Sequence, residues 1–195
     1  MSQVYDRVAL IGLGLIASSI FWASKRNDVS GYVTGFAKSK ETRDIAKKIG
    51  LCDEVFDTVE EAVKDADLVI LCVPVGAMEQ VMLEIAPFLK TGSTISDVGS
   101  VKRAVIDAVE PHLPTDVKFV PAHPLAGTEH SGPESGFASL FDNRWCLLTD
   151  HGSADKEAQN KLMTFWKSLG ANVEFMDADH HDLVLAVTSH APHLI

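Results

Sequence analysis

The sequence predicts an α/β domain in which helices cover both faces of a mostly parallel sheet. Strand-like and helix-like segments alternate along most of the 195 residues, which is the pattern of a doubly wound fold. Several strand candidates are continuously apolar, among them VALI at residues 8–11 and LVILCV at residues 68–73. Strands that are buried on both faces of a parallel sheet have this composition.

The expected elements follow one another in regular order. We expect strands at Arg7–Ile11, Tyr32–Phe36, Glu54–Phe56, Leu68–Val73, Thr94–Asp97, Lys118–Pro121, Trp145–Thr149 and Asn172–Met176. We expect helices at Leu15–Lys25, Lys40–Ile49, Val59–Lys64, Ala77–Leu89, Ser100–His112 and Ala154–Leu169. Each helix lies between two strands, as parallel pairing requires.

The last stretch, DADHHDLVLAVTSHAPHLI, departs from this alternation. Its apolar residues fall at roughly helical spacing, and no strand follows them. The chain then stops on Leu194 and Ile195 without a polar tail. We therefore expect one domain over residues 1–177, and we expect residues 178–195 to be the first helix of a truncated C-terminal helical domain.

Composition and charge exclude several classes of function. The net charge of −10 argues against nucleic acid and anionic membranes as partners, because both need a basic surface. The sequence contains no run of about 18 apolar residues, which is the length that a membrane span needs. The N-terminus also lacks a signal-peptide pattern, so we expect a cytoplasmic protein. Cys52, Cys72 and Cys146 have no CxxC spacing, which predicts buried, reduced thiols.

The first strand runs into a turn with the pattern G-x-G-x-x-A, formed by Gly12, Gly14 and Ala17. Gly12 permits the tight turn, Gly14 lets a pyrophosphate approach the backbone, and Ala17 lets the helix pack closely on the strand. Leu15 and Ile16 in the first helical turn would present N–H groups to the phosphates. At the first strand–helix junction of an α/β chain, the pattern predicts a Rossmann-like dinucleotide-binding domain.

The end of the second strand indicates which dinucleotide is bound. An acid that bonds the adenosine ribose is expected about 20 residues beyond the glycines, but Ala37 holds that position. A 2′-phosphate would meet no repulsion there, and the polar residues that follow could hold it: Lys38, Ser39, Lys40 and Arg43. The sequence favours NADP and leaves NAD open, since such lysines are often only solvated surface charges.

Two later strand ends offer further contacts. Val73 and Pro74 close a strand before a small-residue turn, where a cofactor ribose or nicotinamide could lie, although an ordinary strand–helix turn would look the same. Ser100 follows the strand that ends at Asp97. It could serve only as a helix N-cap, or it could also touch substrate or cofactor.

The segment VPAHPLAGTEHSG, residues 120–132, places a histidine just past another strand end. If that strand is parallel to the others, His123 lies on the ligand-binding edge of the sheet, in front of the rigid Pro124. Oxidation of an alcohol needs a base for the hydroxyl proton, and histidine titrates near neutrality. His123 is therefore the candidate general base.

Taken together, the motifs resemble those of the prephenate dehydrogenases, a family of tyrosine biosynthesis that includes the arogenate and cyclohexadienyl dehydrogenases. GLGLIASS, CVPVGAM, SDVGSVK, HPLAGTEHSG and SHAPH occur in the family's order and at about its spacing. The resemblance implies that His123 is the catalytic base and that Ser100 helps to orient it. It also implies that His193, Thr128 and Glu129 belong to the substrate site.

The implied reaction is the oxidative decarboxylation of prephenate, of arogenate, or of both, with hydride transfer to NAD(P). The products would be 4-hydroxyphenylpyruvate and tyrosine, respectively. The resemblance also implies a homodimer for the full-length protein, and tyrosine as a feedback inhibitor. Histidines are frequent in the second half of the chain, but we expect no metal site, because no cysteine or glutamate completes a tetrahedral set at familiar spacing.

Two alternatives stay open on the sequence alone. An NAD(P)-dependent dehydrogenase of the β-hydroxyacid dehydrogenase or imine reductase type would share the architecture, but such enzymes lack HPLAGTEHSG and commonly use a lysine. A non-catalytic dinucleotide-sensing module would not explain why His123, Ser100 and His193 are all present. Replacement of His123 by Asn discriminates between enzyme and sensor, because only an enzyme would lose turnover.

Overall fold

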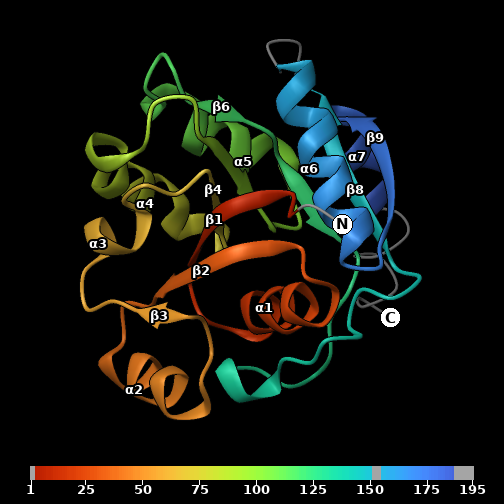
Figure 1. Ribbon diagram of the computed structural model, residues 1–195. Helices are drawn as coiled ribbons and strands as arrows, with labels where there is room; N and C mark the ends of the chain where they lie inside the picture. The colour runs from red at the N-terminus through yellow and green to blue at the C-terminus, as the bar shows by residue number, and fades with distance from the viewer. Residues whose placement is uncertain (1–2, 151–154, 187–195) are drawn as a thin grey trace.

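The computed structural model describes residues 3–150 and 155–186. Its main sheet has six parallel strands in the order β3-β2-β1-β4-β5-β6 (Figure 1). They are β1 Tyr5–Ile11, β2 Ser30–Phe36, β3 Glu54–Val55, β4 Leu68–Leu71, β5 Thr94–Asp97 and β6 Lys118–Phe119. The strand order reverses between β1 and β4, which marks the switch point where ligands bind in open α/β sheets. The predicted doubly wound fold is confirmed.

Helices cover both faces of this sheet. They are α1 Leu15–Asn27, α2 Lys40–Ile49, α3 Val59–Val63, α4 Met78–Ile85, α5 Lys102–Val109 and α6 Lys156–Ser168. Val8 and Leu10 of β1 join the core beneath α1, α2 and α6, whereas Ala9 and Ile11 join the core beneath α3, α4 and α5. Successive side chains of a strand point to opposite faces, which explains why this strand is apolar throughout.

Two predicted helices are shorter than expected. The segment Ala77–Leu89 divides into the 3-10 turn η1 Val75–Ala77, helix α4 and the 3-10 turn η2 Ala86–Phe88. The segment Ser100–His112 begins only at Lys102 and ends in the 3-10 turn η3 Glu110–His112. Pro87 and Pro111 lie in η2 and η3, where a residue without an N–H group ends the α-helical hydrogen bonding.

A second sheet, which the sequence pattern did not predict, carries the last three strands. In it β7 Ala122–Pro124 runs antiparallel to β8 Trp145–Asp150, and β8 runs parallel to β9 Asn172–Asp177. The expected strand Lys118–Pro121 is therefore wrong in its second half, because the chain leaves the main sheet after Phe119. His123 was expected just past the end of a strand, and it lies within the separate strand β7. A three-residue edge strand that contains a proline has too few alternating residues to be recognised from sequence.

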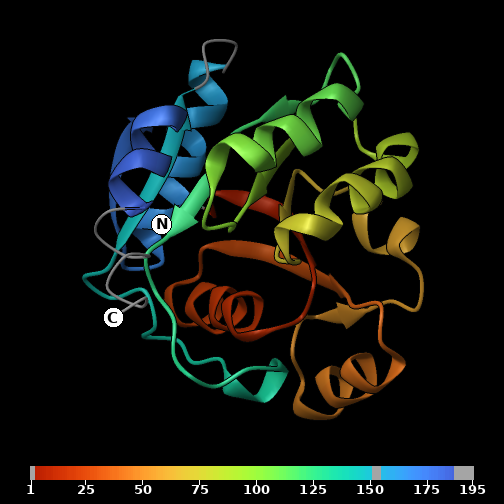
Figure 2. The same ribbon diagram turned by 180° about the vertical axis from the view of Figure 1, so that it is seen from behind.

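The second sheet, α6 and helix α7 Ala178–Leu185 form one flank of the molecule, beside β6 (Figures 1 and 2). α7 begins at the residue where the second domain is predicted to begin, but it packs against α5 and β9. The domain boundary therefore stays a prediction. Within the described residues, no helix combines the length and the apolar character needed to span a bilayer.

Residues 125–144, which we call the crossing segment, connect β7 to β8. The segment leaves the second sheet and carries the 3-10 turn η4 Pro133–Ser135 to a position beside α1 and α2 (Figures 1 and 2). The N–H of Phe137 donates a hydrogen bond to Ser19 Oγ at 3.2 Å. The chain that follows His123 thus crosses toward the first helix.

Candidate active site

A groove of about 570 Å³ opens at the carboxyl ends of β1, β2 and β4. Its size suits a small-molecule or cofactor site. Seven of the residues predicted to bind the cofactor line it: Gly12, Gly14, Ala37, Lys38, Ser39, Val73 and Pro74. Four others do not: Leu15, Ile16, Lys40 and Arg43. The groove therefore follows the predicted path from the glycine-rich turn to the end of β2.

Gly12 and Gly14 differ in the backbone conformation and in the space that a side chain would meet. Gly12 has φ of +99°, and a Cβ there would lie 2.6 Å from the carbonyl oxygen of Cys72. At Gly14, by contrast, an added Cβ would meet no atom within 4 Å. Gly14 is the N-cap of α1, has no side-chain cap, and is followed by a first turn without acidic residues. This open, uncapped helix start fits the phosphates of a dinucleotide.

The end of β2 offers polar groups but no carboxylate. Ala37, Lys38 and Ser39 line the groove there, together with Thr42. Arg43 Nη1 donates to the carbonyl oxygens of Ala37 and Lys38 at 2.8 and 3.0 Å. The guanidinium thus holds the backbone of this turn in place while it lies outside the groove.

The other two cations of the predicted set, Lys38 and Lys40, differ in their position relative to the groove. Lys40 Nζ forms an exposed ion pair with Asp44 at 2.6 Å. Lys38 is exposed and lines the groove. Of the cations predicted to hold a 2′-phosphate, Lys38 therefore lies best for that contact.

One wall of the groove was not predicted from the sequence. Ala77, Gln80, Val81 and Glu84 line it from η1 and α4, and Gly132 lines it from the crossing segment. The four α4-side residues follow the spacing of one helical face. Because Val73 and Pro74 directly precede this helical face, its spacing in the sequence could have predicted this wall of the groove.

Of the three cysteines, Cys52 and Cys146 are buried as expected, whereas Cys72 is partly exposed and lines the groove. All three are free thiols. Burial raises the pKa of each well above the usual thiol value. The thiols are therefore uncharged, and Cys72 contributes an apolar surface to the groove.

The candidate base lies on the same edge of the sheet. His123 follows β6, whose carboxyl end points the same way as those of β1 and β4, because all six strands are parallel. Its exposed fraction is only 9%. Nδ1 of His123 lies 2.9 Å from Nε2 of His181, which belongs to α7. The base is thus a buried histidine with one ring nitrogen already engaged.

A buried ion pair fixes the backbone next to this histidine. Lys102 and Asp97 are both 0% exposed and are bonded to each other. Lys102 Nζ also donates to the carbonyl oxygen of Ala122 at 2.6 Å, and the N–H of Ala122 donates to Asp97 Oδ1 at 3.1 Å. A buried ion pair whose remaining hydrogen-bonding capacity is used in this way holds its neighbours in one arrangement.

The remaining predicted site residues lie in exposed or undescribed parts of the chain. Ser100 is exposed, two residues before α5, and the N-cap of α5 is Val101 without a side-chain bond. The expectation that Ser100 caps this helix is therefore wrong: Asp182 of α7 accepts the N–H groups instead.

Thr128 and Glu129 are exposed in the crossing segment, and Thr128 Oγ1 accepts the N–H of His130 at 3.2 Å. Neither residue lines the dinucleotide groove. His193 lies outside the described residues, as does the rest of the SHAPH motif. The roles of these residues stay predictions.

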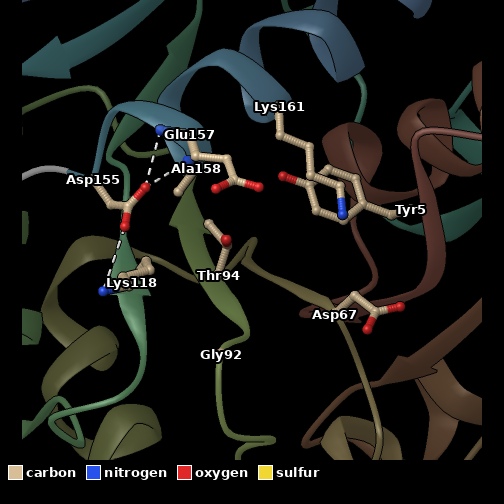
Figure 3. Close-up of a pocket in the computed structure, with 9 residues that line it drawn as sticks. All are labelled: Tyr5, Asp67, Gly92, Thr94, Lys118, Asp155, Glu157, Ala158 and Lys161. Atoms are coloured by element: carbon tan, nitrogen blue, oxygen red, sulfur yellow. Dashed lines mark hydrogen bonds and ion pairs between the residues drawn. The ribbon is translucent and has the colours of Figure 1, made fainter.

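A second hollow, of about 240 Å³, lies at the amino ends of the strands (Figure 3). Lys118 and Asp155 line it and form an ion pair at 3.4 Å, and Asp155 caps the first turn of α6. Lys161 lies over the ring of Tyr5, with Nζ 4.4 Å from the centroid. These polar side chains hold α6 against the sheet. The hollow lies opposite the edge at which α/β sheets bind their ligands.

No three histidine, cysteine or carboxylate side chains gather into a metal-binding set within residues 3–150 and 155–186.

Known proteins resemble this chain over nearly its whole length. A cyclohexadienyl dehydrogenase of Zymomonas mobilis is 44% identical over 192 residues, which make up 98% of this chain and 65% of that protein. The crystal structure of prephenate dehydrogenase from A. aeolicus in complex with hydroxyphenyl propionate and NAD+ matches with a TM-score of 0.90 at 29% identity. That match covers 100% of this chain and 67% of the other.

An arogenate dehydrogenase from Synechocystis matches with a TM-score of 0.88 at 26% identity, over 97% of this chain and 66% of that one.

The chain spans 65%, 53% and 51% of the length of the Zymomonas protein and of two curated prephenate dehydrogenases. Residues 22–175 match the family described as "Prephenate dehydrogenase, nucleotide-binding domain". This match covers most of the chain and includes Ala37, Ser100 and His123. The chain therefore belongs to the prephenate dehydrogenase family.

Proposed function

We propose that the gene product containing this chain catalyses the oxidative decarboxylation of prephenate, of arogenate, or of both, with NAD(P) as hydride acceptor. The observation that carries this proposal is the position of His123. It is a buried histidine on the same sheet edge as a groove whose glycine-rich turn fits a dinucleotide. The relatives, which include a cyclohexadienyl, a prephenate and an arogenate dehydrogenase, support the substrate class.

His123 acts in the proposed mechanism as the general base. It accepts the proton of the ring hydroxyl while hydride leaves the carbon that bears this hydroxyl. The bound dinucleotide supplies the hydride acceptor. The carbonyl that forms is conjugated to the ring, and loss of carbon dioxide makes the ring aromatic. The work of this chain is therefore to position the reactants and to remove one proton.

Ser100, Thr128, Glu129 and His193 complete the proposed site. We assign Ser100 to the orientation of His123 and of the substrate hydroxyl, and the other three to the substrate. We also propose that residues 178–195 begin a helical second domain and that the full-length protein is a homodimer inhibited by tyrosine. Light scattering and activity measured with added tyrosine test the last two assignments.

The first experiment follows formation of the reduced cofactor in the complete gene product, with prephenate and arogenate, each with NAD and NADP. We expect turnover with at least one pair. His123→Asn should then lower kcat by about 10²- to 10⁴-fold, the range for loss of a general base, and should leave dinucleotide affinity unchanged. Absence of turnover with all four pairs, in a protein that binds dinucleotide, contradicts the proposal.

We further propose that NADP is preferred over NAD. Ala37 supplies no carboxylate to repel a 2′-phosphate, and Lys38, Ser39 and Thr42 line the groove beside it. Ala37→Asp should reverse the preference, because a carboxylate repels the phosphate and bonds the ribose hydroxyl of NAD.

Lys38→Ala should raise the KM for NADP about tenfold, which corresponds to about 1.4 kcal/mol, and should leave the KM for NAD unchanged. Lys48→Ala is the matched control, since Lys48 is exposed near the end of α2 and does not line the groove. Equal KM values for NADP in the Lys38 and Lys48 variants would refute the assignment of Lys38.

A further inference from the structure

A chain of three side chains leads from the protein surface to the candidate base. Asp182 Oδ1 lies 2.8 Å from Nδ1 of His181, and Nε2 of His181 lies 2.9 Å from Nδ1 of His123. The two rings meet edge to face, with their centroids 5.1 Å apart. His181 is 0% exposed, and the Asp182 side chain is 26% exposed. The chain thus joins α7 to β7 through a fully buried imidazole.

The carboxylate at the start of this chain is held firmly. Its two oxygens accept the N–H groups of Lys102 at 2.7 Å and Arg103 at 2.9 Å, at the start of α5. Burial by itself raises the pKa of Asp182, but these two donors and His181 outweigh it and lower the pKa below the ordinary value. Asp182 is therefore ionised at neutral pH, and an ionised carboxylate can only accept hydrogen bonds.

The direction of each hydrogen bond follows from that charge. Burial lowers the pKa of His181 despite the opposing effect of Asp182, so this ring is neutral at pH 7. A neutral imidazole has one N–H, and the only arrangement that satisfies Asp182 places it on Nδ1. Nε2 of His181 then carries a lone pair and must accept from Nδ1–H of His123. Neutral His123 therefore carries its own lone pair on Nε2.

We infer that Asp182 and His181 act as positioning residues that fix the tautomer and ring orientation of His123, so that Nε2 is the basic atom. This inference rests on the proposed function of His123 as the base. A carboxylate that holds a histidine base in one tautomer is a known catalytic arrangement. Here the carboxylate acts through a second imidazole, and it compensates the positive charge that His123 gains when it takes the substrate proton.

Other charges also act on this chain. The ammonium of Lys102 on α5 disfavours a second positive charge near His181, whereas Asp97 on β5 and Asp182 on α7 favour it. Lys102 and Asp97 neutralise each other as an ion pair. Among these described groups, Asp182 is the carboxylate to which we assign the support of a protonated His123. Loss of His181 should therefore make protonation of His123 harder and move the acidic limb of the pH–rate profile to lower pH.

The direct test needs no substrate. Nitrogen NMR of the complete protein, labelled with 15N in its histidine rings, distinguishes protonated from unprotonated ring nitrogens. We expect Nδ1 to carry the proton in both His123 and His181. In Asp182→Leu, His181 loses the acceptor of its Nδ1–H, so the preference of both rings for a proton on Nδ1 should weaken. A wild-type His123 protonated on Nε2 would overturn the inference.

The kinetic test compares three substitutions in α7. His181→Leu leaves Nδ1–H of His123 without its acceptor and should lower kcat about 100-fold, with little change in KM, and shift the pH–rate profile. His181→Gln offers an amide oxygen near the position of Nε2 and should restore most of the lost activity. His180→Gln is the matched control, because His180 is the exposed neighbour in the same helix and should behave as wild type.

Equal losses in the Gln and Leu variants, with an unshifted pH–rate profile, would reduce His181 to a packing residue and overturn the inference. Failure of the proposed function gives a different result. The wild-type protein would then lack turnover, while the tautomers seen by NMR would still be those expected.

Discussion

At the scale of single residues, Gly12 and Gly14 of the glycine-rich turn differ in the space that surrounds them. The carbonyl of Cys72 at the end of β4 lies where a side chain at position 12 would go, and the backbone of Gly12 is in the left-handed region. Nothing occupies the corresponding space at Gly14. Gly12 is therefore required by the backbone of the protein itself, whereas we propose that the open space at Gly14 serves the dinucleotide.

This difference gives a paired prediction. Gly12→Ala should lower the free energy of unfolding by about 2 kcal/mol or more, since strained backbone and a backbone clash combine. Gly14→Ala should leave the free energy of unfolding nearly unchanged but weaken dinucleotide binding about tenfold or more, because the methyl group takes the space of a phosphate. Urea unfolding and calorimetric titration with NAD and NADP measure the two effects. Equal destabilisation by both substitutions would contradict this division.

At the scale of elements, the contacts that hold His123 come from segments distant in sequence. α5 has no side-chain cap of its own, and Asp182 of α7 supplies one across 80 residues of chain.

The crossing segment in turn packs η4 against α1. A Cβ at Gly136 would lie 2.1 Å from Ser18 Oγ and 2.7 Å from the backbone nitrogen of Ser19. The segment and the first helix are therefore in contact without room for a methyl group.

We predict that Gly136→Ala displaces the crossing segment from α1. Because Gly132 of the same segment lines the groove, the substitution should lower the unfolding temperature and weaken dinucleotide binding together. Overpacking of a close contact costs about 1–3 kcal/mol, which for a domain of this size corresponds to a shift of about 2–12 °C. Differential scanning fluorimetry with and without dinucleotide measures both effects.

Gly127→Ala is the control for stability in the same segment, because a Cβ at Gly127 would meet no atom within 4 Å. It should leave the unfolding temperature unchanged. If Gly136→Ala also left it unchanged, the segment would not pack on α1 as described.

At the scale of the whole molecule, the titrating groups predict how stability depends on pH. His181 has a folded-state pKa below its ordinary value of 6.5, so the unfolded chain binds its proton first as the pH falls. Stability should therefore decrease once the pH drops below about 6.5. Ion pairs and hydrogen bonds lower the pKa values of Asp57 and Asp142 below 3.8, and their contribution is lost only in stronger acid.

Urea unfolding between pH 7.5 and pH 5 tests the first of these two steps. His181→Gln removes the titrating group and should flatten the dependence in that range. His180→Gln should keep the wild-type slope, because His180 is exposed. A slope that is equal in wild type and His181→Gln would show that another group is responsible.

The fold could be predicted to a large extent because its signals are local. The apolar run of β1, the glycines that follow it and the alternation of strands and helices are each read within a few residues. β7 could not be predicted, because its three residues form a strand only by pairing with β8, more than 20 residues later. The helix start at Lys102 depends on Asp182 for the same reason.

The sequence by itself determined the doubly wound sheet, the dinucleotide turn at Gly12 and Gly14, and His123 as the candidate base. These follow from periodicity, backbone freedom and motif spacing, which are properties of short segments. Only the tertiary structure decided which ring nitrogen of His123 is engaged and by what. His181 looks like any other histidine in the sequence, and it acquires its partner only because α7 packs on α5 and brings a buried imidazole against β7.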